Sequence, residues 1–517
     1  MKNYLKNIPG IMMLVILLTS CFDDLNVTPI NPNTVVSEKL YKTESDYLRG
    51  LAKVYAGFNL SGAIGPDGDP DFVGFDEGFS TYFRGWWNAQ EVTTDEAVSR
   101  GDAQAGLPDF HFQSWTATNS YLAIIHARIL YNIAVCNEFI RNATDTGFPA
   151  VDQYRAEARF WRAFYYWHAM DMFGTSPFVT EEHTPGAFFP ERATREELFS
   201  YVESELKDID ATLGEPGFQY GRVDKSVAWM LLAKIYLNAE VYIGESRYDE
   251  VITEINKITT NGSFSLADEH RHNFVADNHT SPEIILPIMF DGNHTQSWGG
   301  ATYLMAGAMG GGSIPAEQFI GITAQWGITR TTSALVNLFE SSDVRATFWS
   351  DGQTLEIEDI ELFSHGYMST KFKNRKLNGD LSDSNNGTHP DTDFPLFRLA
   401  DAYLMYAEAV VRGASNGDMG TALDYVNQLR TRADASTLGA LSLTELLDER
   451  ARELFWEGHR RTDLIRFGQF SDGSKVWPWK GGVKEGVAVN SCKDVFPVPA
   501  TQIAANPNLE QIEPCYN

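Results

Sequence analysis

Cysteine and positive charge are both scarce in this chain of 517 residues, which contains 4 Cys and 41 Lys or Arg against 69 Asp or Glu. The formal net charge of −28 argues against nucleic acid or an anionic lipid surface as a partner, because both require a basic patch. No CxxC pair or Cys/His cluster predicts a metal site. The closest histidines, His270 and His272, lie in a polar, turn-like segment, where we expect solvated side chains. Of the ligand classes considered, neutral molecules therefore remain.

The N-terminal apolar run, Ile11 to Leu18, is too short to cross a bilayer. Two lysines precede it and the sequence LTSC follows it, which is the pattern of a bacterial signal peptide that ends in a lipoprotein cleavage site. We predict a signal peptide over residues 1–20, lipidation of Cys21, and a polar tether over residues 21–43. The alternative is an ordinary signal peptide with a chance cysteine.

Three further cysteines follow Cys21. An exported protein could join Cys492 to Cys515 and so hold its C-terminal tail. The spacing is not diagnostic, and buried free thiols, as for Cys136, are an equal alternative. The sequence leaves both states of the pair open.

Helical periodicity predicts an α-dominated fold with little β-structure. Apolar or small residues recur at offsets 0, +3, +4 and +7, as in the first helix of a tetratricopeptide repeat. The copies are Leu48/Leu51/Ala52/Tyr55, Phe160/Ala163/Phe164/Trp167, Trp229/Leu232/Ala233/Tyr236 and Tyr403/Tyr406/Ala407/Val410. We expect partner helices at about 119–142, 194–213, 248–259 and 418–433, each approaching closely at the small residue.

These copies are unevenly spaced, which an uninterrupted repeat array does not allow. We therefore predict a single domain over residues 44–517, with loop-rich insertions at about 59–107 and 262–393. The plainer alternative is a set of ordinary amphipathic helices in an α-helical domain.

Within the second insertion, the stretch from His294 to Trp326 is rich in glycine and cannot form a core of its own. A long loop in a compact protein is usually functional or disordered. Trp298 is followed by two glycines, and Trp326 lies between Gln325 and Gly327, without an apolar pattern to direct either ring inward. This favours flat apolar faces on display, suited to sugar rings, whose hydroxyls need fixed polar partners.

Six blocks of the sequence resemble the SusD/RagB family, the nutrient-binding surface lipoproteins of Bacteroidetes, over nearly the whole chain. The blocks are AEARFWRAFYYWHAMDMFGTSPF (156–178), GRVDKSVAWMLLAKIYLNAEVYIG (221–244), PEIILPIMFDGNHTQSWGGATYL (282–304), HPDTDFPLFRLADAYLMYAEA (389–409), ERARELFWEGHRRTDLIRFGQF (449–470) and FPVPATQIAANPNLEQ (496–511). The acidic pair Asp23-Asp24 after Cys21 also resembles the surface-export signal of such lipoproteins.

The resemblance implies a binding protein without catalytic activity or cofactor, anchored in the outer membrane by its N-terminal lipid and facing the cell surface. It also implies an oligosaccharide ligand, expected to be a starch-type α-glucan, and delivery to a SusC-like TonB-dependent transporter. Trp298 and Trp326 match two stacking aromatics of the family's starch site. Asp76, Arg84 and Gln104 match positions of its polar contacts.

One position departs from the family pattern. Where the third aromatic stands in the starch site, this chain reads Ser99-Arg100-Gly101. Trp86 or Trp87 could replace it, although large aromatics in such a pair are more often core residues. The departure weakens the case for starch and leaves a β-glucan or a peptide nutrient as alternatives.

An α-helical glycoside hydrolase is a further alternative, which would need two carboxylates at a fixed separation. Glu449, Glu453 and Glu457 recur at i, i+4 and i+8. We expect these three on one helical face, neutralised by Arg460, Arg461 and Arg466 in a structural ion-pair network. Asp391 and Asp393 are a second candidate pair, in a block, DTDFPL, to which the resemblance assigns no chemistry.

Overall fold

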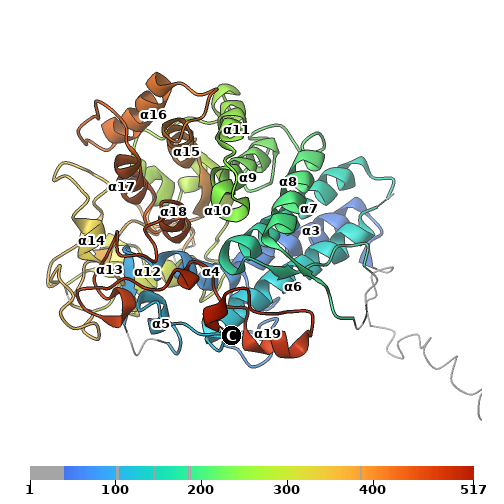
Figure 1. Cartoon of the computed structure of the whole chain (residues 1–517), viewed down its shortest axis with the longest axis horizontal. Coiled ribbons are helices and arrows are strands. Elements are labelled where there is room, and N and C mark those ends of the chain that lie inside the picture. The colour runs from blue at the N-terminus through green and yellow to red at the C-terminus, as the bar shows by residue number, and fades with distance from the viewer. Residues whose placement is uncertain are drawn as a thin grey trace, which may run out of the picture.

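Four packed helix pairs form the scaffold (Figure 1). The structure is a computed structural model and describes residues 40–100, 104–144, 146–183, 186, 188–311, 313–384 and 387–516, so the predicted signal peptide and Cys21 lie outside the described residues. The pairs are α3 (Glu44–Asn59) with α6 (Ser120–Asn142), α7 (Pro149–Phe173) with α8 (Arg195–Ile209), α9 (Lys225–Leu237) with α11 (Tyr248–Thr260), and α15 (Leu399–Val411) with α16 (Met419–Arg432). Each pair packs on the next, which confirms the predicted helix-dominated fold.

Alanines account for the close packing in the second, third and fourth pairs. The three that the pattern singled out are completely buried: Ala163, Ala233 and Ala407. For the first pair the prediction was wrong, because Ala52 is exposed. There α3 approaches α6 at Gly57, where an added Cβ would lie 2.7 Å from the side-chain oxygen of Asn132. Glycine thus takes the place of the predicted alanine.

The two insertions contain more regular structure than their composition indicated. Helix α4 (Tyr82–Glu91) lies in the first and is buried on every side, so it has no polar face for periodicity to reveal. Further helices are α5 (Pro108–His111), α10 (Ala239–Ile243), α12 (Ala301–Ala308), α13 (Ala316–Phe319), α14 (Ser333–Val336), α17 (Leu443–Leu454), α18 (Arg460–Arg466) and α19 (Ala500–Ala505). Short 3-10 helices are η1 (His270–Phe274), η2 (Asn278–Thr280), η3 (Lys480–Gly482), η4 (Ser491–Asp494) and η5 (Pro514–Tyr516).

The β-structure of the described residues is limited to four small antiparallel sheets of two strands each. They pair β1 (Ala97–Ser99) with β5 (Thr329–Thr331), β2 (Ser176–Pro177) with β3 (Arg192–Ala193), β4 (Ile284–Ile288) with β8 (Phe394–Arg398), and β6 (Phe348–Trp349) with β7 (Met368–Ser369). The β1–β5 pair matters most for function, because it joins the first insertion to the second.

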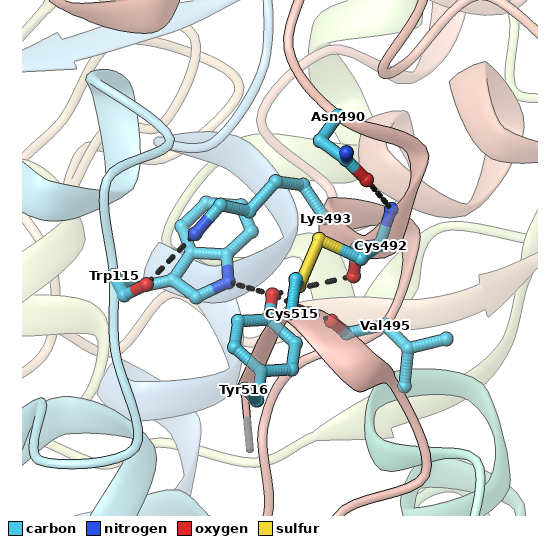
Figure 2. The surroundings of a disulfide bond; sticks show 7 residues. All are labelled: Trp115, Asn490, Cys492, Lys493, Val495, Cys515 and Tyr516. Carbon is cyan, nitrogen blue, oxygen red and sulfur yellow. Dashed lines mark hydrogen bonds between the residues drawn. A yellow bond between two sulfur atoms is a disulfide. The ribbon is translucent and has the colours of Figure 1, made fainter.

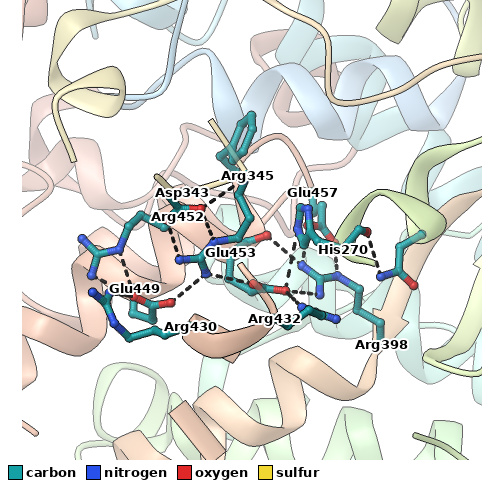
Figure 3. A network of polar contacts seen from close by, with 12 residues as sticks. His270, Asp343, Arg345, Arg398, Arg430, Arg432, Glu449, Arg452, Glu453 and Glu457 are labelled. Atoms are coloured by element: carbon teal, nitrogen blue, oxygen red, sulfur yellow. Dashed lines mark hydrogen bonds and ion pairs between the residues drawn. The ribbon is translucent and has the colours of Figure 1, made fainter. Parts of the chain in front are cut away.

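A buried ion-pair network surrounds α17 (Figure 3). Arg345 Nη1 lies 2.7 Å from a carboxylate oxygen of Glu449 and 2.9 Å from one of Glu453. Arg398 binds Glu453 at 2.7 Å and Glu457 at 2.6 Å. Burial raises the pKa of Glu453, but Arg432 and Arg398 outweigh burial and hold that pKa well below its ordinary value. The network therefore keeps its carboxylates ionised inside the protein.

The structural interpretation of these glutamates is confirmed, but the predicted partners were wrong. Arg460 binds Asp95, Arg461 donates to the carbonyl oxygen of Asp494, and Arg466 binds Glu408 and Asp463. The helix α17 ends at Leu454, so Glu457 lies beyond it. Contrary to the prediction, Glu457 therefore does not share a helical face with Glu449 and Glu453.

The expectation of a solvated His270 was also wrong. The ring is buried in η1, with Nε2 at 3.8 Å from Glu453. Burial lowers its pKa well below the ordinary value, so the imidazole is neutral at pH 7. The neighbouring His272 lies nearer the surface and its Nε2 contacts the Thr280 hydroxyl at 2.8 Å.

Cys136 is a buried free thiol. A disulfide joins Cys492 to Cys515, which decides between the two open states of this pair (Figure 2). Next to it, the Tyr516 hydroxyl accepts from Trp115 Nε1 at 2.9 Å. Lys493 donates to the Trp115 carbonyl oxygen at 2.8 Å. The C-terminal segment is thus fastened to the segment that follows α5.

Candidate functional site

The two insertions meet at one loop-rich face. In the β1–β5 ladder, Ser99 lies opposite Thr329. A second contact brings Gly78 against Trp298, since a Cβ added at Gly78 would lie 2.6 Å from the Trp298 Cβ. Gly299 likewise approaches Thr81 too closely for any side chain. Residues that are about 220 positions apart in sequence are therefore held in one site.

Trp298 and Trp326 lie next to each other on this face. Both are half-buried, with ring centroids 6.1 Å apart and planes inclined by 52°. The Trp326 backbone N–H donates to the carbonyl oxygen of Ala306 in α12 at 2.8 Å, which fixes that ring to a buried helix. The pair thus presents partly exposed aromatic surface next to a buried helix.

Glu77 anchors the Trp298 loop and was missed by the sequence analysis. Its buried carboxylate accepts from the Trp298 backbone N–H at 2.9 Å and from the Ser297 hydroxyl at 2.9 Å. The Ser61 hydroxyl donates to it at 2.6 Å. With these bonds Glu77 ties three segments of the face together, and its role follows from burial that no local pattern reveals.

His389 packs beneath Trp298, with ring centroids 4.7 Å apart. Its Nδ1 contacts the Thr302 hydroxyl of α12 at 3.1 Å. Burial lowers the pKa of His389, so the ring is uncharged at pH 7. This neutral ring, inclined by 53° to the half-buried indole, helps to hold it in place.

Arg84 lies below the surface, which is deeper than expected for a ligand contact. The residue is 3% exposed, and its guanidinium carbon lies 4.0 Å from the centre of the Tyr303 ring. Tyr303 in turn lies 6.5 Å from Trp326, between ring centroids. The Arg84 Nε has no hydrogen-bond partner among the described residues. Arg84 therefore supports the aromatic layer from beneath.

Tyr121 connects the other predicted polar residues. Its hydroxyl donates to the side-chain oxygen of Gln104. Burial raises the pKa of Tyr121, while Arg84 acts against this rise through its charge and a hydrogen bond. The same balance of burial and Arg84 applies to the raised pKa of Tyr303. Both phenols are therefore neutral at pH 7, and they donate inside the protein, Tyr121 to Gln104 and Tyr303 to the side-chain oxygen of Asn88 at 2.8 Å.

Asp76 is exposed at the edge of the same face, where its carboxylate accepts from the Phe79 backbone N–H at 3.1 Å. The Phe79 ring packs edge-on against Tyr121, with centroids 4.5 Å apart. All five residues predicted from the sequence thus belong to one connected set. We call this set the aromatic face; its members are Asp76, Phe79, Arg84, Gln104, Tyr121, Trp298, Tyr303 and Trp326.

Trp86 and Trp87 do not replace the missing third aromatic. Both are core residues of α4, where the Trp87 indole N–H donates to the Trp456 carbonyl oxygen at 3.1 Å. Gly101, the position of the family's third aromatic, lies outside the described residues. Of the residues that the sequence analysis proposed for stacking, Trp298 and Trp326 are those that lie on the aromatic face.

The carboxylates of Asp391 and Asp393, which were considered for hydrolysis, accept hydrogen bonds from the scaffold. Asp391 accepts from the backbone N–H groups of Gly292 and Ser384, each at 2.8 Å. Asp393 accepts from the Phe290 backbone at 2.8 Å and from the Tyr220 hydroxyl at 2.7 Å. In the described ranges, no group of three or more His, Cys, Asp or Glu is arranged to hold a metal ion.

Comparison with known families matches residues 321–516 to the SusD family, and residues 87–237 to a family described as starch-binding and associating with the outer membrane. The starch-binding protein SusD of Bacteroides thetaiotaomicron is 32% identical to this chain over 99% of both proteins. The SusD-like protein P25 of Formosa agariphila is 23% identical and covers 97% of this chain and 98% of its own length.

Solved structures show the same fold. Surface glycan-binding protein A from Bacteroides thetaiotaomicron, in complex with laminarihexaose, has a TM-score of 0.68 at 19% identity and covers 91% of this chain and 99% of its own. A laminarin-binding SusD-like protein has a TM-score of 0.68 at 21% identity and covers 90% and 98%. At these identities the likeness concerns the fold. The names of the starch-binding protein SusD and of these two solved structures describe binding.

Proposed function

Since the chain belongs to the SusD/RagB family, we propose that it is a cell-surface lipoprotein that captures an oligosaccharide on the aromatic face and delivers it to a SusC-like TonB-dependent transporter. The observation that carries this proposal is the half-buried Trp298–Trp326 pair, 6.1 Å between ring centroids, on a support of buried helix and loop. A sugar ring stacks its C–H face on such indoles, while its hydroxyls bond to fixed polar groups.

The support for a preorganised site comes from the layer beneath the two indoles. His389 backs Trp298, and Tyr303 lies between Arg84 and Trp326. Rings that are already held in place lose little rotamer freedom when a ligand arrives, which favours binding. The exposed Asp76 and the half-buried Gln104 supply oxygen and amide groups for sugar hydroxyls at the edge of this layer.

The ligand we propose is a starch-type α-glucan. The protein named for starch binding is the relative that shares 32% identity with this chain. A β-glucan is the second candidate, because Gly101 occupies the position of the family's third stacking ring and so leaves the shape of the binding surface different. A peptide nutrient is the third ligand class.

Isothermal calorimetry with maltoheptaose, laminarihexaose and a mixture of casein peptides tests the ligand. We expect binding of maltoheptaose that is lost in the Trp298→Ala/Trp326→Ala double variant and kept in Phe189→Ala, which removes an exposed aromatic between α7 and α8. Binding of laminarihexaose or of peptides instead of maltoheptaose would show that the ligand is a β-glucan or a peptide. Binding of none would overturn the proposal. Release of reducing ends on long incubation would favour a hydrolase.

Anchoring and delivery need separate tests. Labelling of cells with a fatty-acid analogue is expected to mark the wild-type protein and not the Cys21→Ala variant. Affinity purification of the intact protein from outer membranes is expected to recover a TonB-dependent transporter. Recovery of the chain alone, from membranes in which it is lipidated and surface-exposed, would contradict delivery through such a complex.

A further inference from the structure

A phenylalanine next to Asp76 extends the aromatic face beyond the residues considered so far. Phe75 is 39% exposed. Its ring lies almost parallel to that of Phe79, at 17° with 6.2 Å between centroids. Because Phe79 packs edge-on against Tyr121, Phe75 is joined through two ring contacts to the group that binds Gln104.

The backbone around Phe75 is built to hold it there. Gly74 adopts a φ of +88°, a conformation that favours glycine, and so turns the chain just before Phe75. Immediately after it, the Asp76 carboxylate accepts from the Phe79 N–H at 3.1 Å, and the Ser80 N–H donates to the Asp76 carbonyl oxygen at 3.1 Å. These bonds fix the turn over which Phe75 and Phe79 stack.

Phe75 also lies close to the tryptophan pair. It precedes Gly78 by three residues, and Gly78 touches Trp298. Three residues of extended chain span at most about 11 Å between Cα atoms. Phe75 and Trp298 are therefore within the reach of one short oligosaccharide.

We propose that Phe75 is an additional sugar-stacking residue, which holds a neighbouring unit of the glycan while Asp76 bonds to a hydroxyl of that unit. This inference rests on the proposed glycan-binding function. One ring face of Phe75 is backed by Phe79, and the exposed part of the ring is available to a sugar. Such an arrangement supplies the stacking surface that Ser99 and Arg100 do not.

The neighbouring Val73 provides a matched control. It lies in the same loop and is 99% exposed, so it is an apolar side chain without an aromatic partner. If Phe75 were merely an apolar residue on a loop, truncating either side chain would have the same small effect on ligand binding.

Calorimetric titration of Phe75→Ala, Phe75→Trp, Val73→Ala and Trp298→Ala with maltotriose and maltoheptaose tests the proposal, with laminarihexaose in their place if the wild type prefers it. We expect Phe75→Ala to weaken maltoheptaose binding by about fivefold to tenfold, the scale of one aromatic contact. The effect on maltotriose should be smaller, and Phe75→Trp should restore affinity. Thermal melting curves are expected to show that all the loop variants are folded at the temperature of the titration.

Two negative results are distinguishable. If Phe75→Ala binds both ligands as Val73→Ala does while Trp298→Ala loses affinity, the role of Phe75 is overturned and the proposed function stands. If neither Trp298→Ala nor Phe75→Ala weakens binding, or the wild type binds no glycan, the proposed function has failed together with the inference.

Discussion

The ion-pair network around α17 and the aromatic face are both rich in polar side chains, but they use them in opposite ways. Around α17, the carboxylates of Glu449, Glu453 and Glu457 are completely buried and bonded to arginines within the protein. On the aromatic face, Asp76 is exposed and Gln104 is half-buried. The dense charges thus serve the fold, whereas the sparser polar groups beside the half-buried rings are those that we propose for ligand binding.

The largest expected effect comes from breaking the network. Glu453→Ala should lower the free energy of unfolding by about 3–5 kcal/mol, because it leaves Arg398 and Arg432 buried without their shared carboxylate. The measurement is urea denaturation followed by fluorescence. Protein that remains folded should bind glycan as the wild type does.

The matched control for this variant is Glu445→Ala, an exposed glutamate on the same helix. It should change stability by no more than about 0.5 kcal/mol. Equal stability of Glu453→Ala and Glu445→Ala would show that the buried network contributes nothing to the fold.

The disulfide should have the next largest effect on the scaffold. It closes a loop with a sequence separation of 23, for which chain entropy predicts about 3 kcal/mol of stabilisation. The Cys492→Ser/Cys515→Ser variant should unfold at correspondingly lower urea concentration, and dithiothreitol should affect the wild type but not the variant. A variant as stable as the oxidised wild type would mean that the Tyr516–Trp115 bond alone fastens the C-terminus.

Sequence periodicity was sufficient for the scaffold and insufficient for the pairing of charges. The helices that carry Ala163, Ala233 and Ala407 were predicted because amphipathic spacing is a local property. The partners of Glu453 were not, since Arg345 and Arg398 come from segments more than 50 residues away and are placed by tertiary packing. The densest run of arginines near Glu453 was therefore a misleading guide.

For the site, the sequence predicted the two tryptophans and missed what holds them. Trp298 and Trp326 stand out because glycines surround them and no apolar pattern directs them inward. Glu77 bonds to the Trp298 loop across the two insertions, and the buried Tyr303 contacts Arg84 of the first insertion, which no short motif records. The depth of Arg84 was unpredictable for the same reason, since α4 is buried on every side.

Glu91 and Glu96, a carboxylate pair beside the network, are expected to affect stability with the opposite pH dependence to the network itself. Burial raises the pKa of Glu91 to about 7. Burial, and next the charge of the neighbouring Glu91, raises the pKa of Glu96 well above its ordinary value. The unfolded chain releases these protons near pH 4.3, so ionisation of this pair costs stability as pH rises from about 4.5 to 7. Around α17, where pKa values are lowered, stability is instead lost as pH falls.

Glu91→Gln should therefore stabilise the protein by about 2–3 kcal/mol at pH 8 and much less at pH 5. The amide can still accept from the Gly458 N–H, as the carboxylate does. Urea denaturation at both pH values is the measurement, with Glu445→Gln as the exposed control. A variant less stable than the wild type at pH 8 would show that burial does not raise the pKa of Glu91 in the folded state.

The smallest expected free-energy change is on the aromatic face, where Trp298→Ala and Trp326→Ala should each weaken glycan binding by about 1–3 kcal/mol. Stability should change little by comparison with Glu453→Ala, because both rings are half-buried at the surface. Since the rings are 6.1 Å apart, the losses should not add in the double variant. Additive losses measured by calorimetry would mean that the tryptophans hold separate sugar units, whereas full affinity in both single variants would place the ligand away from this face.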